Sequence, residues 1–133
     1  MYRVKMMLIG CCVSVMLLTG CAAGAKDDQA AAKTVQAYWQ AMVARDLNQV
    51  VALSCAAWEA QARTEFNSFS AVKLTLDKVA CTASGQTGET VQVTCSGAII
   101  ANYGAEDLTI DIANRSYQVT SEGGEWRMCG YGQ

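Results

Sequence analysis

The spacing of apolar residues changes once along the chain, near Ala71, and this change constrains the fold more than any single motif. Before Ala71 the apolar residues recur every three or four positions, which is typical of amphipathic helices. After Ala71 they alternate with polar residues and β-branched side chains become frequent, as in half-buried strands. The sequence therefore predicts an α+β domain in which N-terminal helices pack on a curved antiparallel sheet of about four strands.

Three helices are expected before the change of period. The first should begin at Asp27 or Asp28, and its apolar stripe follows i, i+3, i+4, i+7, i+8: Val35, Tyr38, Trp39, Met42 and Val43. A short second helix should start at Asp46, since Gln49 three positions later completes a variant capping box. The third helix should present one apolar face: Trp58, Ala62, Phe66 and Phe69.

Irregularities in the alternation predict where the strands bend or turn. The parity of the apolar residues changes at 77–78, which predicts a β-bulge, and again at 114–115, which predicts a break or a second bulge. Glycine-containing turns are expected at 84–89 and at 122–125, and the second strand should end near 102–104. These positions divide the second half of the chain into an antiparallel meander.

The first twenty residues have the layout of a signal peptide. Arg3 and Lys5 precede an apolar run over 6–18, which is too short to span a bilayer. Small residues then lead directly to Cys21. We expect residues 1–20 to be a cleaved export signal.

The segment Leu18-Thr19-Gly20-Cys21 resembles the lipobox of bacterial lipoprotein precursors. The resemblance implies that Cys21 carries acyl chains such as palmitate, and that cleavage makes it the first residue of the mature protein. Two or three acyl chains would give a stable anchor, whereas one would be marginal. The implied organisation is a signal peptide over 1–20, a lipidated tether over 21–29 and one domain over 30–133. The implied location is the bacterial cell membrane or outer membrane. The alternatives are an ordinary secretory signal with a chance cysteine and a membrane-spanning helix.

Four cysteines remain beyond the lipidation site: Cys55, Cys81, Cys95 and Cys129. An even number in an exported domain favours disulfide bonds, and three pairings are open. We expect Cys81–Cys95 to join the strands of a hairpin and Cys55–Cys129 to tie the helices to the last strand; the alternative is that some are free buried thiols. Metal binding is not expected, because the chain has no histidine and its remaining cysteines are widely spaced.

The charge balance argues against a nucleic-acid partner. The chain has a net charge of −2 at pH 7, and loss of Arg3 and Lys5 with the signal makes the remainder more acidic. Nothing in it resembles a basic stripe. No cofactor-binding motif is present either, so the expected partners are the membrane, a small apolar ligand or another envelope protein.

Two segments resemble the nuclear-transport-factor-2-like (NTF2-like, cystatin-like) superfamily, and more narrowly its bacterial lipoprotein members of unknown function. The first runs over 35–55, with the pair Tyr38-Trp39 and the turn Arg45-Asp46. The second is the ending Tyr117-Gln118-Val119 … Glu122-Gly123-Gly124-Glu125-Trp126-Arg127-Met128-Cys129. The resemblance covers about 30–131 and implies a cone-shaped half-barrel wrapped around helices, with a pocket at its open end.

Enzymes with this fold commonly use an Asp–His pair, or an aspartate base with a tyrosine hydroxyl. The first arrangement is excluded because the chain has no histidine. The second would join Tyr38, Tyr103 or Tyr117 to Asp107 or Asp111. Asp111 alternates with two isoleucines and is therefore expected to face solvent. We assign no catalytic residue from the sequence.

Aromatic residues are the candidates for lining a pocket: Tyr38, Trp39, Trp58, Tyr103 and Tyr117. The alternative is that they are core residues. We expect a non-catalytic module that binds a ligand or a protein; the alternatives are an isomerase- or dehydratase-like enzyme and an envelope-assembly subunit. A buried carboxylate beside a tyrosine in an open cone would favour an enzyme, and a cone filled by Trp39, Trp58 and Phe66 would exclude one. A contiguous apolar sheet surface would favour an assembly subunit.

Overall fold

The computed structural model describes the backbone of residues 22–133 and the side chains from Asp27 onward. The expected signal peptide over 1–20 and the lipidation site Cys21 lie outside the described residues. The described chain forms three helices and one five-stranded antiparallel sheet. The elements are α1 (Ala22–Ala44), α2 (Leu47–Ala52), α3 (Glu59–Ser68), β1 (Lys73–Thr87), β2 (Thr90–Asn102), β3 (Asp107–Asp111), β4 (Ser116–Glu122) and β5 (Glu125–Gly132). Within this part of the chain, no helix is long and apolar enough to span a membrane.

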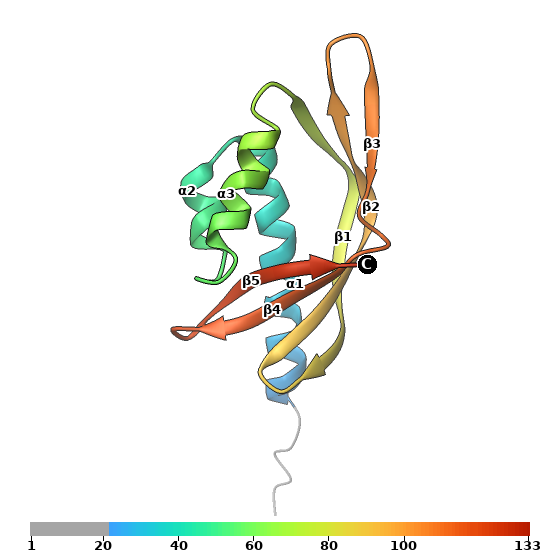
Figure 1. Ribbon diagram of the computed structural model, residues 1–133. Coiled ribbons are helices and arrows are strands. Elements are labelled where there is room, and N and C mark those ends of the chain that lie inside the picture. Colours follow the sequence, from blue (N-terminus) through green and yellow to red (C-terminus); the bar gives the residue numbers. More distant parts are fainter. Residues whose placement is uncertain (1–21) are drawn as a thin grey trace, which may run out of the picture.

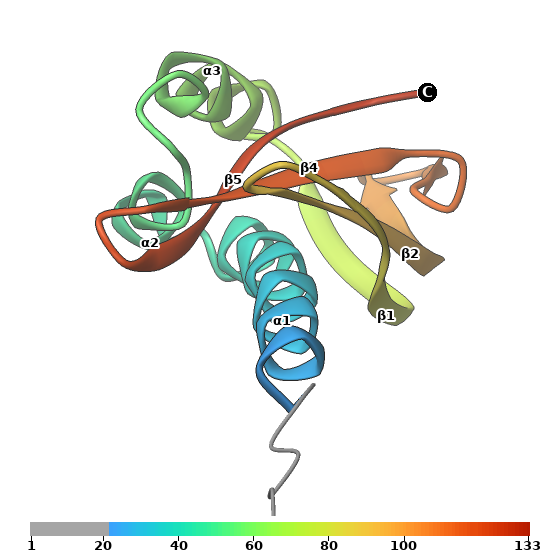
Figure 2. The ribbon, with the colours of Figure 1, turned by 90° about the horizontal axis from the view of Figure 1, so that it is seen from below.

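All three helices lie on the same side of β1, β2 and β3, and β4 and β5 cross in front of α1 (Figure 1). Seen from below, β1 and β2 lie along one side of α1, and β4 and β5 run across above it (Figure 2). The expected α+β architecture, a cone-like sheet around helices, is therefore confirmed. The hairpin of β2 and β3 extends beyond the helices (Figure 1), and Leu108 on its inner face is 53% exposed.

The curvature of the sheet depends on the long strand β2. Along one edge of β2, residues 90–94 pair with β4 and residues 98–102 pair with β3. Along the opposite edge, β2 pairs with β1. The two halves meet at Gly97, which has a φ of 89° and lies opposite a bulge in β1 where Lys78 has a φ of 51°. Because the bend falls in the middle of β2, β4 and β5 can wrap across the helices.

The core fills the space between α1 and the concave face of the sheet. The predicted stripe of α1 is buried there, with Val43 at its margin. The strands contribute alternate residues to the same core: Leu74, Val91, Val93, Cys95, Ile99, Ala101, Tyr117, Val119 and Met128. Ile112, just after β3, is buried with them. Exclusion of these side chains from water is the main stabilising contribution to the fold.

The helical half is fastened to the last strand at Cys55. The Cys55 N–H donates to the Met128 carbonyl at 2.9 Å, and the Met128 N–H donates to the Leu53 carbonyl at 2.7 Å. A disulfide bond joins Cys55 to Cys129, and a second joins Cys81 to Cys95. These are the two pairs expected from the sequence, and Cys81 and Cys95 face each other across β1 and β2.

Several local predictions agree with the structure. The Asp46 side chain accepts the Gln49 N–H at 3.0 Å and caps α2. The bulge near 77–78, the break before Ser116 and the glycine turn between β4 and β5 are all present.

Three features of the fold differ from those expected: the start of α1, the length of one turn and the number of strands. Helix α1 begins at Ala22 rather than at Asp27 or Asp28, so residues 22–29 are helical and do not form an extended tether. The alanine-rich sequence of this segment has a high helix propensity, which explains the earlier start. The turn expected at 84–89 is confined to Gly88 and Glu89, because β1 and β2 continue to Thr87 and from Thr90. The sheet has five strands because the chain breaks between β3 and β4, which pair with different halves of β2.

Candidate functional site

Two tyrosine hydroxyls converge on one carboxylate at the junction of α1, α3 and β5. The Tyr38 hydroxyl donates to Glu65 Oε2 at 2.8 Å, and the Tyr131 hydroxyl donates to Glu65 Oε1 at 2.5 Å. Each oxygen of the carboxylate therefore has its own phenol donor. Hydrogen bonds to an ionised acceptor are among the stronger ones in proteins.

The local structure explains why these side chains meet. Tyr38 belongs to the buried stripe of α1, and Glu65 lies one helical turn after Ala62, the buried residue of α3. Positions three apart share a helix face, so Glu65 is turned toward the interior. Tyr131 follows Gly130, where a Cβ would come within 3.1 Å of the Trp58 ring. Glycine at this position gives the Trp58 ring room to pack against β5.

Burial and the charge of Glu65 keep both phenols protonated. Burial raises the pKa of Tyr38, and the negative charge of Glu65 raises it further. Burial also raises the pKa of Tyr131, together with the hydrogen bond that its hydroxyl donates to Glu65. Both hydroxyls therefore remain donors across the neutral and moderately alkaline range.

Aromatic rings surround this cluster and fill the interior of the cone. Trp39 makes edge contacts with Tyr38 at 5.6 Å and with Tyr117 at 6.4 Å between ring centroids. Tyr131 lies 5.5 Å from Tyr117 and 5.6 Å from Trp58. Trp39 is only 1% exposed and Tyr117 is fully buried, so the centre of the cone is packed rather than open.

Three polar atoms in this aromatic cluster are buried without a hydrogen-bond partner. They are Trp39 Nε1, Trp58 Nε1 and the Tyr117 hydroxyl. Burial also raises the pKa of Tyr117, so its hydroxyl stays protonated. The Trp58 side chain partly offsets the raised pKa of Tyr38, and the Trp39 side chain partly offsets that of Tyr117, so each indole lies near a phenol hydroxyl. The polar atoms of the aromatic cluster therefore lie near one another, outside strict hydrogen-bond geometry among the described residues.

A hollow of about 340 Å³ opens beside the cluster, between α3 and the strands β3 and β5. Its lining consists of Trp39, Gln61, Thr64, Glu65, Ser68, Phe69, Ile110, Arg115 and Tyr131. The Arg115 guanidinium lies 4.6 Å from the centre of the Tyr131 ring, a cation–π arrangement. One wall therefore has a carboxylate and another a guanidinium, with aromatic and aliphatic surface between them.

The structure brings together four of the five aromatic residues proposed from the sequence, namely Tyr38, Trp39, Trp58 and Tyr117. Of these, Trp39 lines the hollow and the others lie in the packed cluster around it. Tyr103 does not join them: it is 57% exposed in the turn between β2 and β3.

The carboxylates proposed from the sequence lie elsewhere. Asp107 accepts a hydrogen bond from the Asn102 amide at 2.6 Å on the outside of the sheet. Asp111 is exposed, as expected, and accepts the Ala113 N–H at 2.8 Å. Neither contacts a tyrosine hydroxyl in the described hydrogen-bond network. The carboxylate beside the tyrosines is Glu65, which the sequence did not single out.

Sequence reasoning also missed Tyr131 and Arg115. The only local signal for Glu65 is its spacing of three from Ala62, which places it at the edge of the apolar face of α3. Nothing local connects α3 with residue 131, because this contact depends on how β5 crosses the helices.

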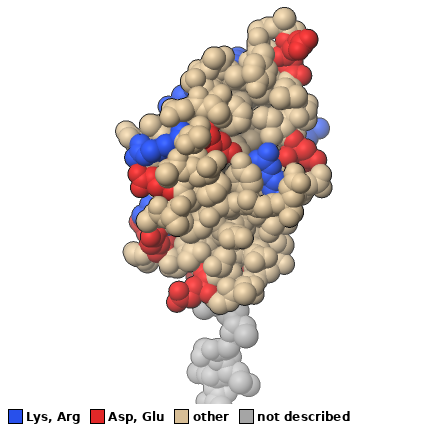
Figure 3. Space-filling view, in the orientation of Figure 1, with Lys and Arg blue, Asp and Glu red and all other residues tan. Residues whose placement is uncertain are grey.

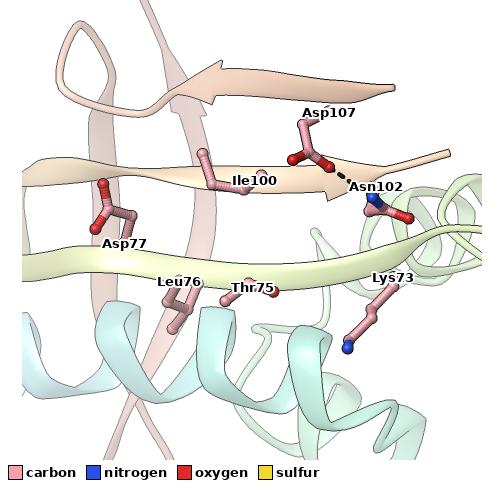
Figure 4. Close-up of a pocket in the computed structure, with 7 residues that line it drawn as sticks. All are labelled: Lys73, Thr75, Leu76, Asp77, Ile100, Asn102 and Asp107. Carbon is pink, nitrogen blue, oxygen red and sulfur yellow. Dashed lines mark hydrogen bonds between the residues drawn. The ribbon is translucent and has the colours of Figure 1, made fainter. Parts of the chain in front are cut away.

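The outer face of the sheet has a larger hollow, of about 480 Å³, but its polar groups do not converge (Figure 4). Asn102 and Asp107 bond to each other, while the Lys73 ammonium points away from both carboxylates in the view. Acidic and basic side chains are interspersed on the face shown in Figure 3 and form no large patch of one sign. The large hydrophobic residues that are exposed in the described chain are Tyr103 and Leu108, so a contiguous apolar sheet surface is not observed there.

No family model matches the sequence, and no curated protein matches it. Solved structures do share its fold. Aln2 from a Streptomyces species aligns with 80% of this chain and 88% of its own, with a TM-score of 0.55 at 13% identity. A candidate dehydratase of the NTF2-like family from Streptomyces avermitilis aligns over 80% and 93%, with a TM-score of 0.52 at 13% identity. A SEC-C motif containing protein from Rhodopseudomonas palustris aligns over 77% and 79%, with a TM-score of 0.53 at 11% identity. The chain thus has the NTF2-like fold, and identities this low support the fold alone.

Proposed function

We propose that this protein is a lipid-anchored envelope protein that binds a small molecule in the hollow beside Glu65 and Tyr131. The observation that carries the proposal is the composition of the hollow. It combines apolar surface from the half-buried Phe69 and Ile110 with the charged groups Glu65 and Arg115. Ligand sites in proteins have this character: a mostly apolar concave surface with a few polar groups that fix orientation.

The two hydrogen bonds that Glu65 accepts favour ligand binding over catalysis. Both of its oxygens accept a phenol hydroxyl, and these bonds hold α3 against α1 and β5. A carboxylate committed to two structural hydrogen bonds is poorly placed to take a proton from a substrate. Because Trp39 is packed at the centre of the cone, a ligand can occupy only the hollow beside it and cannot enter the cone.

A fragment screen tests the binding proposal. The full chain is purified and screened by ligand-observed NMR against small aromatic and aliphatic acids, amides, alcohols and amines. Ser68→Trp should abolish binding by filling the hollow, because Ser68 lines it. Asn67→Trp adds the same bulk at an exposed neighbouring position outside the lining and should leave binding unchanged. Absence of binding by every fragment, or equal effects of the two variants, would refute the proposal.

The anchor is proposed from the segment that ends at Cys21. Since α1 begins at Ala22, lipid on the preceding residue would hold the domain close to the membrane surface. Cys21→Ser should release the protein from membranes and eliminate labelling by a radioactive or clickable fatty acid. The double variant Cys81→Ala with Cys95→Ala, which removes the disulfide of shorter span and leaves no unpaired thiol, controls for cysteine loss and should stay labelled and membrane-bound. Continued membrane retention of Cys21→Ser would overturn the assignment.

A second candidate function is proton transfer at carbon, as in an isomerase or dehydratase. The observation that favours it is that a carboxylate and two phenols, the groups such chemistry needs, meet beside the hollow; Glu65 would have to release one phenol before it could take a proton from a substrate. The test is exchange of α-protons of bound carbonyl compounds with deuterium from D₂O, followed by NMR. Catalysed exchange that Glu65→Gln abolishes would establish the enzyme; no exchange in the wild type would exclude it for those compounds.

A further inference from the structure

We infer that the ligand of the hollow has polar groups at two ends: a carboxylate that binds Arg115 and a hydrogen-bond donor that binds Glu65. This inference rests on the proposed binding function and specifies its ligand class. The expected ligand is a small compound with a flat apolar body, such as a hydroxyaryl carboxylate. Three features of the hollow lead to this class.

The first feature is the Arg115 guanidinium. Arg115 lines the hollow and is half-buried, with the Tyr131 ring 4.6 Å below its guanidinium. The ion pairs in the described part of the chain are Arg63–Glu59 and Arg127–Glu125, so Arg115 forms none there. A guanidinium fixed on an aromatic face presents a planar set of donors that matches a carboxylate. It therefore provides the anion-binding end of the hollow.

The second feature is the remaining capacity of the Glu65 carboxylate. Tyr38 and Tyr131 each use one lone pair on a different oxygen. An ionised carboxylate offers about four lone-pair positions, so each oxygen can accept one more donor. An anion placed beside Glu65 would be repelled, whereas a hydroxyl or ammonium group would be bound. The end of the ligand that reaches Glu65 should therefore be a donor.

The third feature is the size and lining of the space between these two ends. At about 340 Å³ the hollow is at the lower end of the range for ligand pockets, about 300–1,000 Å³. Phe69 and Ile110, which are half-buried, supply the apolar surface of the hollow, and the edge of the buried Trp39 lies behind it. A single ring or short chain fills such a space, and the opposite charges of Arg115 and Glu65 orient it.

Four ligands of nearly the same shape test the inference: 4-hydroxyphenylacetate, 4-hydroxyphenylacetamide, 4-methylphenylacetate and 4-methylphenylacetamide. The amide removes the negative charge, and the methyl group removes the donor. Affinities are measured by isothermal titration with the full chain. The hydroxy acid should bind about tenfold more tightly than either singly altered compound, as expected for loss of a charge-assisted hydrogen bond.

Protein variants assign each end to its residue. Arg115→Gln should weaken the hydroxy acid about tenfold and leave its amide unchanged, and Arg115→Lys should recover only part of the loss because a lysine lacks the planar fork. Glu65→Gln should reduce the ratio of the affinity for 4-hydroxyphenylacetate to that for 4-methylphenylacetate. If that variant unfolds, the donor end is judged from the wild-type affinities of the hydroxy and methyl compounds.

The outcomes separate this inference from the proposed function. Equal affinity for acid and amide, or an Arg115→Gln loss that is the same for both, would overturn the inference while binding in the hollow stands. Failure of all four compounds, with other fragments bound and blocked by Ser68→Trp, would also overturn only the ligand class. Failure of every fragment in the screen would refute both proposals.

Discussion

Gly97 of β2 lies so close to Lys78 of β1 that a Cβ on residue 97 would come within 2.6 Å of the Lys78 carbonyl oxygen. Both residues have positive φ angles, 89° for Gly97 and 51° for Lys78. They lie opposite each other where the register of β1 and β2 shifts. This contact marks the bend that turns a flat hairpin into the wall of a cone.

Gly97→Ala should therefore destabilise the protein by about 1–3 kcal/mol, because the added carbon meets backbone atoms that cannot move aside. Gly85→Ala is the matched control: it lies in β1 and a Cβ there would meet nothing within 4 Å. Urea unfolding followed by circular dichroism measures both. A Gly97→Ala variant as stable as Gly85→Ala would show that the bend does not depend on this glycine.

The contacts of Glu65 should contribute measurably to stability. Removing either phenol hydroxyl leaves one carboxylate oxygen without its donor, so Tyr38→Phe and Tyr131→Phe should each lower the free energy of unfolding by about 1.5–3 kcal/mol. Tyr103→Phe removes an exposed hydroxyl and should change it by less than about 0.5 kcal/mol. Similar values for all three variants in urea unfolding would argue against a structural role for Glu65.

The two disulfide bonds should differ in their contribution to the free energy of unfolding. Cys55–Cys129 spans a sequence separation of 74 and Cys81–Cys95 one of 14. In the chain-entropy view the longer loop restricts the unfolded state more, so the bonds should contribute about 4 and 3 kcal/mol. Paired Cys→Ala variants of each bond, compared by urea unfolding, test this order. A larger loss for Cys81→Ala with Cys95→Ala would contradict it.

The parts of the fold that sequence predicted are those fixed by local pattern. The α1 stripe of Val35, Tyr38 and Met42 is buried because side chains at helical spacing share one face. The bulge at Lys78 was predictable because a change of parity in a strand requires an extra residue. The bend at Gly97 was not predicted, because a glycine in a strand does not indicate what backbone approaches it.

The candidate site was predicted less well, because it depends on contacts between distant segments. Glu65 is separated from Tyr131 by 66 residues, and no pattern within α3 distinguishes it from a solvated glutamate. Tyr103 was proposed for the pocket because ligand sites are lined mainly by apolar and aromatic side chains. Its position at the tip of the β2–β3 hairpin, beyond the helices, leaves it exposed instead.

Alkaline pH should weaken the fold through the buried tyrosines. Their pKa values are raised above the ordinary 10.0 in the folded state, by burial and by Glu65 for Tyr38 and Tyr131, and by burial for Tyr117. The contribution of these groups to stability is therefore complete below about pH 10 and falls as the pH rises further, because the unfolded chain releases protons that the folded chain retains. Tyr38 and Tyr131, whose pKa values are raised most, each add a slope of about 1.4 kcal/mol per pH unit above pH 10.

Tyr38→Phe tests this linkage directly. The variant should be less stable than the wild type near neutral pH, where the lost hydrogen bond dominates. Between about pH 10 and 11.5 its stability should decline more slowly, by about 1.4 kcal/mol per pH unit, because one protonated phenol has been removed. Urea unfolding at a series of pH values gives both slopes, and phenolate absorbance should rise together with unfolding. Identical slopes for the wild type and Tyr38→Phe would mean that Tyr38 ionises in the folded protein as readily as in the unfolded chain.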